Sequence, residues 1–129
     1  MPEIRTEYFP LKEETDAVIH CGFEVHNTLG FGFLEIVYKD ALECEFKKND
    51  ILFAREKEYL VQYKDPILRH KFYADFIVFD LVVLEVKAKD SIVPDDIARM
   101  INYLKCVGCK VGLILNFGRN KLEIKRMVF

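Results

Sequence analysis

The sequence predicts a single α/β domain whose elements follow the order α-α-β-β-β-α-β-β. Three observations predict this class. Three segments repeat apolar residues at helical spacing, five shorter segments are alternating or wholly apolar, and turn residues separate them. The chain has 129 residues, of which 51% are apolar, and this is enough for one core. We therefore expect residues 1–129 to fold as one domain.

The first two elements are predicted to be helices. Residues 12–28 carry apolar side chains near helical spacing, and Gly30 is placed to end that helix. The second helix is expected over residues 33–48, because its apolar positions keep the helical period until Asn49. Both helices precede every expected strand.

Five strands and a third helix account for the rest of the chain. The run from Phe76 to Lys89 is apolar on both strand faces, so it belongs in the middle of a sheet. Pro94 is placed to open the third helix and Gly108 to end it. The expected strands are 53–63, 69–79, 81–88, 111–117 and 122–128, and the third helix is expected over 94–107.

Three charged residues, Asp75, Glu85 and Lys87, lie inside the most apolar stretch of the chain, residues 72–88. Burying three charges there is costly unless they pair or hold a metal ion. Strand side chains alternate, so Glu85 and Lys87 share one face. If Asp75 lies on the neighbouring strand of a hairpin, all three side chains converge.

Two carboxylates and an ammonium are the groups that metal-assisted phosphodiester hydrolysis requires. Mg²⁺ prefers oxygen ligands and usually takes one or two protein carboxylates, with water and phosphate completing its shell. Asp75 and Glu85 are the candidate ligands of Mg²⁺ or Mn²⁺, and the backbone carbonyl of Val86 is a further one. Lys87 would hold the attacking water and offset charge in the transition state. A buried Glu–Lys pair without metal is the alternative that spacing leaves open.

A second set of motifs resembles a known protein family. Residues 25–38 read VHNTLGFGFLEIVY and closely resemble the signature of the GxxExxY family, with Gly32, Glu35 and Tyr38 at its three named positions. That family is placed among the PD-(D/E)xK nuclease-like proteins. The resemblance covers residues 14 to 127, and its further segments are 74–75, 84–87, 102–104 and 111–118.

This resemblance implies a restriction-endonuclease-like core, in which a mixed central β-sheet of roughly four strands is flanked by helices. It implies that Asp75, Glu85 and Lys87 form the nuclease motif. It also implies that Glu35, on the helix before the sheet, adds a further catalytic carboxylate.

Two residues near the Gly30 turn are candidates for substrate binding. Glu35 and Tyr38 share a helix face, which we expect to point at the metal site, with Gly32 letting the backbone approach closely. Core packing is the alternative for Tyr38. His26 is a candidate acid, base or phosphate contact, and its alternative is to cap a helix end or fill a packing position.

The third helix departs from the family pattern. Asp96 stands where the family usually has a His, and Arg99 stands where it usually has a Gln. Arg99 either binds substrate phosphate or pairs with Glu85 and blocks the metal. The departure bears on catalysis and leaves the fold expectation unchanged.

Charge and size indicate the partners. Residues 1–98 hold 12 basic and 20 acidic side chains, a net charge of −8, whereas residues 99–129 hold seven basic and one acidic, a net charge of +6. The basic end suits nucleic acid, DNA or RNA, or else balances the acidic part as a solvated rim. A chain of this size has little room for target recognition, so we expect a homodimer or a protein partner. A catalytically inactive module that binds nucleic acid or a partner is the alternative function.

The sequence also suggests a location. We expect the cytoplasm, because the first residues lack the apolar segment of a signal peptide and no apolar run approaches the ~20 residues of a membrane helix. Reduced thiols are expected there. We interpret the cysteines as small core residues, with a metal or iron–sulfur site as the alternative; they are Cys21, Cys44, Cys106 and Cys109.

Overall fold

The computed structural model describes residues 10–129 and confirms the predicted element order α-α-β-β-β-α-β-β. Six of the eight elements both begin and end within one or two residues of expectation, and the two exceptions form one hairpin. The elements are α2 (Lys12–Leu29), α3 (Glu35–Lys48), β1 (Phe53–Tyr59), β2 (Phe72–Val78), β3 (Val82–Lys87), α4 (Pro94–Val107), β4 (Val111–Asn116) and β5 (Glu123–Val128).

The five strands form one mixed sheet in the order β1-β2-β3-β4-β5. This is the number of strands that the sequence pattern predicts, and one more than the roughly four that the family resemblance implies. Neighbouring strands are antiparallel except β3 and β4, which are parallel. A parallel pair needs a long crossover, and α4 supplies it between these two strands. The sheet therefore combines a parallel pair joined by a helix, β3 and β4, with antiparallel pairs on either side.

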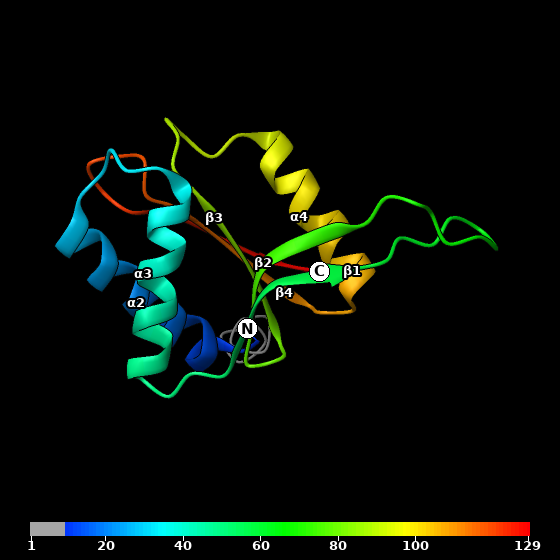
Figure 1. Ribbon diagram of the computed structural model, residues 1–129, viewed down its shortest axis with the longest axis horizontal. Helices are drawn as coiled ribbons and strands as arrows, with labels where there is room; N and C mark the ends of the chain where they lie inside the picture. Colours follow the sequence, from blue (N-terminus) through cyan, green and yellow to red (C-terminus); the bar gives the residue numbers. More distant parts are fainter. Residues whose placement is uncertain (1–9) are drawn as a thin grey trace, which may run out of the picture.

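The helices cover both faces of the sheet. Helices α2 and α3 pack together over one face, and α4 lies over the other (Figure 1). Two separate apolar clusters follow from this layering, one that includes Leu42 of α3 with Leu84 of β3, and one that includes Met100 of α4 with Ile114 of β4. No helix among residues 10–129 is long and apolar enough to cross a bilayer.

The β1–β2 hairpin is shorter than predicted. β1 ends at Tyr59 instead of residue 63, and β2 begins at Phe72 instead of residue 69. The intervening segment projects from the body as an arm that holds one isolated bridge, between Gln62 and Ile67 (Figure 1). Residues 60–71 are exposed except for the half-buried Val61, so the alternating side chains have little core to pack against and regular pairing stops.

The pairing of β1 with β2 is interrupted at Glu56 and Asp75, which lie between the pairs Arg55–Phe76 and Lys57–Ala74. Glu56 has a φ of 55°, a left-handed conformation that costs a residue with a Cβ about 1–2 kcal/mol. Ala74 packs in the cluster under α4 and Phe76 in the cluster under α2 and α3, although residues two apart on a regular strand share a face. The alternation of β2 side chains between the two faces of the sheet is therefore shifted at Asp75.

Candidate functional site

Asp75 and Glu85 meet where the ladder between β2 and β3 opens. Backbone pairing of these strands reaches Phe76 and Leu84 and goes no further. Beyond that point the side chains replace the backbone partners. The Val86 N–H donates to Oδ2 of Asp75 at 2.8 Å, and the Asp75 N–H donates to Oε1 of Glu85 at 3.3 Å. The two carboxylates are thus drawn into one gap between the strands.

This gap disfavours two negative charges. Asp75 and Glu85 are each only 8% exposed. Burial raises the pKa of Glu85 to about 8, with the nearby Asp75 adding to the rise and Lys87 opposing it. Glu85 therefore holds a proton at neutral pH unless a cation enters the gap.

The donor set fits a divalent cation. Carboxylate oxygens are the hard ligands that Mg²⁺ and Mn²⁺ take, and a cation between Asp75 and Glu85 would relieve the repulsion that raises the pKa of Glu85. Among residues 10–129, no group of three or more His, Cys, Asp or Glu side chains is arranged to hold a metal. Water and substrate oxygens would therefore supply the rest of the shell, as is usual for Mg²⁺.

Lys39 belongs to this site, although the sequence analysis missed it. It is 7% exposed, and its Nζ lies 3.1 Å from Oδ1 of Asp75 and also contacts Oε1 of Glu56. Burial alone would lower the pKa of Lys39, but the hydrogen bonds to Glu56 and Asp75 outweigh burial and the pKa is raised. One signal was present in the sequence: Lys39 follows Glu35 by four residues and shares its helix face.

Glu35 and Lys87 flank the gap. Glu35 lies in the first turn of α3 and is exposed. Its pKa is raised, first by partial burial and then by Asp75, while Lys87 and Lys39 oppose the rise. These couplings show that Glu35 lies within electrostatic range of Asp75 and Lys87. Lys87 ends β3 and is half-buried.

The segment after Lys87 is clamped by the loop that follows β4. The buried Asn116 accepts the Lys89 N–H through Oδ1 at 3.0 Å and donates from Nδ2 to the Lys89 carbonyl at 3.0 Å. The Phe117 N–H donates to the Lys87 carbonyl at 2.8 Å. A Cβ on Gly118 would lie 2.3 Å from the Lys89 backbone. The Asn-Phe-Gly segment therefore fixes the chain just beyond the candidate lysine.

Arg99 and Asp96 pair with each other on α4. Arg99 is half-exposed, and its Nη1 lies 3.7 Å from Oδ1 of Asp96. Oδ2 of Asp96 accepts the Val93 N–H at 2.9 Å and lies 2.5 Å from Nζ of Lys89. Asp96 thus caps its own helix. In the described chain, no ion pair joins Arg99 to Glu85, so the predicted block of the metal by this pairing is not seen.

Tyr38 and His26 lie in the packed interior next to the site. The Tyr38 hydroxyl donates to the Gly30 carbonyl at 2.7 Å and accepts the Phe33 N–H at 3.2 Å, and its ring stacks on Phe117 at 4.7 Å. Tyr38 is fully buried. His26 is 7% exposed, and its Nε2–H donates to the Arg119 carbonyl at 2.8 Å. Both geometries match the packing alternatives rather than contact with a substrate.

Gly32 has a different role from the one expected. A Cβ at Gly32 would meet nothing within 4 Å, so no backbone approaches it closely. Its φ of 110° is the feature that requires glycine. The prediction of close approach was wrong, because the space beside Gly32 is open.

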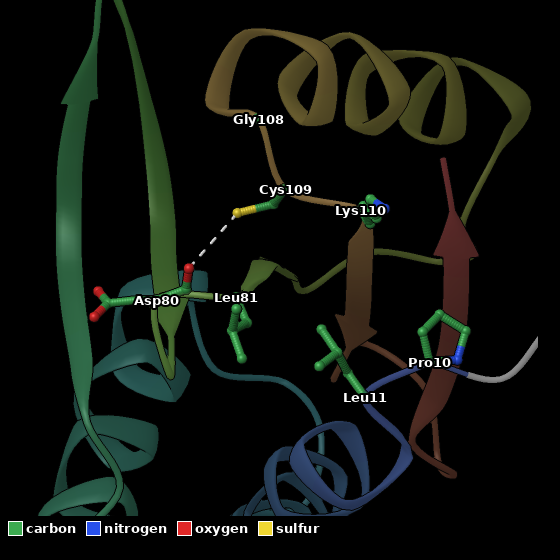
Figure 2. A pocket seen from close by; sticks show the side chains of 7 residues that line it. All are labelled: Pro10, Leu11, Asp80, Leu81, Gly108, Cys109 and Lys110. Atoms are coloured by element: carbon green, nitrogen blue, oxygen red, sulfur yellow. Dashed lines mark hydrogen bonds between the residues drawn. The ribbon is translucent and has the colours of Figure 1, made fainter.

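A hollow of about 320 Å³ lies at the other end of β3, away from Lys87 (Figure 2). Asp80, Leu81 and Cys109 line it among others, and the Cys109 thiol approaches the Asp80 carbonyl at 4.0 Å. Its walls are mainly apolar and hold none of the predicted site residues. It therefore has no part in the chemistry expected of the carboxylates.

The four cysteines are free thiols. Cys21 is buried in the core, as interpreted from the sequence. Cys44 and Cys106 are exposed and Cys109 is half-buried, so the core interpretation was wrong for Cys44 and Cys106. Both lie on helix surfaces that face away from the apolar clusters.

The chain resembles known proteins most clearly at the level of a superfamily. No curated protein matches the sequence. A solved structure titled "Crystal structure of SSO0001" aligns with 73% of this chain at 19% identity and a TM-score of 0.58, a likeness of fold alone, and this chain spans half of that one (50%). The family described as the PD-(D/E)XK nuclease superfamily matches residues 12–127. That match covers nearly all of the sequence, and the chain belongs to the PD-(D/E)XK nuclease superfamily.

Proposed function

We propose that this protein is a metal-dependent nuclease that hydrolyses phosphodiester bonds of nucleic acid. The observation that carries the proposal is the meeting of Asp75 and Glu85 in the opened gap between β2 and β3. Lys87 lies at the end of β3, the strand that also carries Glu85. Asp75 and Glu85 are the proposed ligands of Mg²⁺ or Mn²⁺, and the Val86 carbonyl is a proposed further ligand. When bound, the cation supplies Lewis acidity and a more acidic water.

The protein's own residues have distinct proposed roles. Lys87 orients the attacking water and offsets negative charge that develops on the phosphate. Glu35, an exposed residue that is electrostatically coupled to Asp75 and Lys87, accepts or relays a proton, and its raised pKa suits this task. The clamp on Lys89 keeps the strand end, and with it Lys87, in one position.

Superfamily membership and the GxxExxY resemblance both support nucleic acid as the substrate. Arg99, half-exposed on α4, is the proposed phosphate contact. Tyr38 and His26 support the site from the core instead. DNA and RNA are both suitable on this chemistry, and a homodimer or protein partner is the proposed source of further target recognition.

A cleavage assay on mixed DNA and RNA substrates with Mn²⁺ tests the function. We expect Lys87→Ala to lower the rate by about 10²–10³-fold, the usual loss for one such catalytic group. Lys12→Ala is the matched control, since Lys12 is an exposed lysine in the first turn of α2, outside the basic end of the chain, and should leave the rate unchanged. Equal cleavage by the wild type and Lys87→Ala would remove Lys87 from the mechanism.

An inactive binding module on the same fold is the second candidate. One observation favours it: a buried ammonium, Lys39, already contacts Asp75. This candidate predicts salt-dependent binding of oligonucleotides with no cleavage in Mg²⁺ or Mn²⁺. If the protein binds neither nucleic acid nor metal, a partner-binding role is favoured instead.

A further inference from the structure

The Lys39 ammonium is the positive charge bound between the carboxylates of Asp75 and Glu56. Its Nζ bridges Oδ1 of Asp75, at 3.1 Å, and Oε1 of Glu56. The Lys39 side chain is 8% exposed, whereas the Glu56 side chain is 47% exposed. The ammonium is therefore shared between one buried carboxylate and one that reaches solvent.

A divalent cation and the Lys39 ammonium compete for Asp75. Oδ2 of Asp75 accepts the Val86 N–H, and Oδ1 accepts from Lys39. An ion bound by the same carboxylate would lie within a few ångströms of the ammonium, where two positive charges repel strongly in a poorly solvated gap. Tight ion binding thus requires Lys39 to withdraw from Asp75.

Glu56 offers Lys39 a second position. The pairing of β1 with β2 skips Glu56 and Asp75, and the left-handed φ of 55° at Glu56 departs from the regular strand at the residue that contacts the ammonium. A left-handed residue with a Cβ inside a strand is unusual and marks a site that the surrounding structure holds in place. With Glu56 present, Lys39 keeps an ion pair after it leaves Asp75.

We propose that Lys39 is a built-in competitor of the divalent cation, shared by Asp75 and Glu56 in the metal-free protein and held by Glu56 alone when the ion enters. The proposal rests on the proposed function, because it takes Asp75 as a metal ligand. Lys39 keeps the buried carboxylates compensated without metal and weakens the affinity for the ion. The site is then loaded only when the cation is abundant or substrate phosphate adds further ligands.

Calorimetric titration with MnCl₂ tests the competition without relying on cleavage. We expect Lys39→Met to bind Mn²⁺ at least tenfold more tightly than the wild type, since methionine fills similar volume without the charge. Lys47→Met is the matched control: it removes a lysine from the same helix, but one that is 67% exposed and pairs with Glu43. The control should bind Mn²⁺ as the wild type does. Equal or weaker binding by a folded Lys39→Met overturns the proposal.

Glu56→Gln keeps the test decisive if Lys39→Met does not fold. Glu56 is half-exposed, so the substitution is tolerated more easily. Loss of one negative charge alone weakens Mn²⁺ binding somewhat, whether or not Lys39 is present. The proposal requires more: Glu56→Gln should weaken binding in the wild-type background several-fold more than in the Lys39→Met background. Equal effects in both backgrounds overturn the transfer to Glu56.

The outcomes separate this proposal from the proposed function. If the wild type and Lys39→Met bind Mn²⁺ equally, and Asp75→Ala abolishes the heat in both, the metal site stands and the competition falls. If neither protein binds Mn²⁺, both proposals fall. If only Lys39→Met binds, the competition is supported in its strongest form.

Discussion

The backbone N–H of Val86 is bonded to a side chain of the neighbouring strand, Oδ2 of Asp75, at 2.8 Å. If the backbone pairing of β2 with β3 continued, this N–H would not bond to a side chain of β2. The bond shows that the opening between β2 and β3 is itself hydrogen-bonded, so the gap is a defined feature of the fold rather than a frayed strand end.

The raised pKa of Glu85 predicts a pH dependence of stability in the metal-free protein. The folded chain keeps the proton up to about pH 8, whereas an unfolded chain releases it near the ordinary value of 4.5. The folded state thus binds more protons between these values, and the free energy of unfolding falls as pH rises through this window, by roughly 5 kcal/mol. Glu35 contributes with the same sign.

Urea unfolding at pH 5.5, 7 and 8.5 in the presence of a chelator measures this slope. Glu85→Gln should flatten it. Glu58→Gln is the control and should keep it, because hydrogen bonds from Lys71 and Tyr73 lower the pKa of Glu58 and place its titration outside the window. A slope unchanged in Glu85→Gln would contradict the protonated state.

Gly118→Ala is expected to destabilise the fold by about 2–3 kcal/mol. The added Cβ would lie 2.3 Å from the backbone of Lys89, and backbone cannot yield as a flexible side chain does. Gly108→Ala, in open space with a φ of 80°, should cost only about 1 kcal/mol through its left-handed conformation. Urea denaturation of both variants gives the comparison, and equal losses would argue against the clamp.

Tyr38→Phe separates a packing role from a substrate role. The lost hydroxyl leaves the Gly30 carbonyl and the Phe33 N–H without their partner, which should cost about 1–2 kcal/mol of stability. Because Tyr38 is fully buried, cleavage by the folded variant should change less than about threefold. A hundredfold loss of rate with little loss of stability would instead assign the hydroxyl to the reaction.

Arg99→Ala tests the phosphate contact. The guanidinium is half-exposed, and among residues 10–129 its ion pair is the long one to Asp96, at 3.7 Å, so the side chain can turn to a phosphate. We expect weaker oligonucleotide binding and a loss of about 0.9 from the slope of log affinity against log salt. Lys12→Ala is the control, an exposed lysine paired with Asp16 in the first turn of α2. An unchanged slope in Arg99→Ala would exclude the contact.

Elements with local stop signals were predictable from the sequence. Helix α4 spans the expected residues 94–107, because Pro94 opens it and Gly108, with a φ of 80°, ends it within the segment itself. β1 was predicted four residues too long, because its alternation continues to Tyr63 while its packing partners end at Tyr59. An alternating pattern of apolar and polar residues shows that a segment favours strand structure. How much of the segment pairs depends on its packing against the rest of the fold.

The candidate site was predictable where it lies on one hairpin and unpredictable where it crosses elements. Asp75 and Glu85 follow from strand spacing, and their hydrogen bonds agree with it. From the sequence, Lys39 is expected on the solvent-exposed face of its helix. Its burial depends on two carboxylates from β1 and β2, Glu56 and Asp75, whose meeting no local pattern reveals.

The parallel pairing of β3 with β4 has a consequence for synthesis of the chain. The carboxylates and Lys87 all leave the ribosome before α4 does, yet the Asn116 clamp on Lys89 spans 27 residues and waits for β4 to dock. Long-range parallel pairing forms late because its loop must close first. A nascent or truncated chain that stops before residue 116 therefore carries every acidic group of the site without the geometry that positions its lysine.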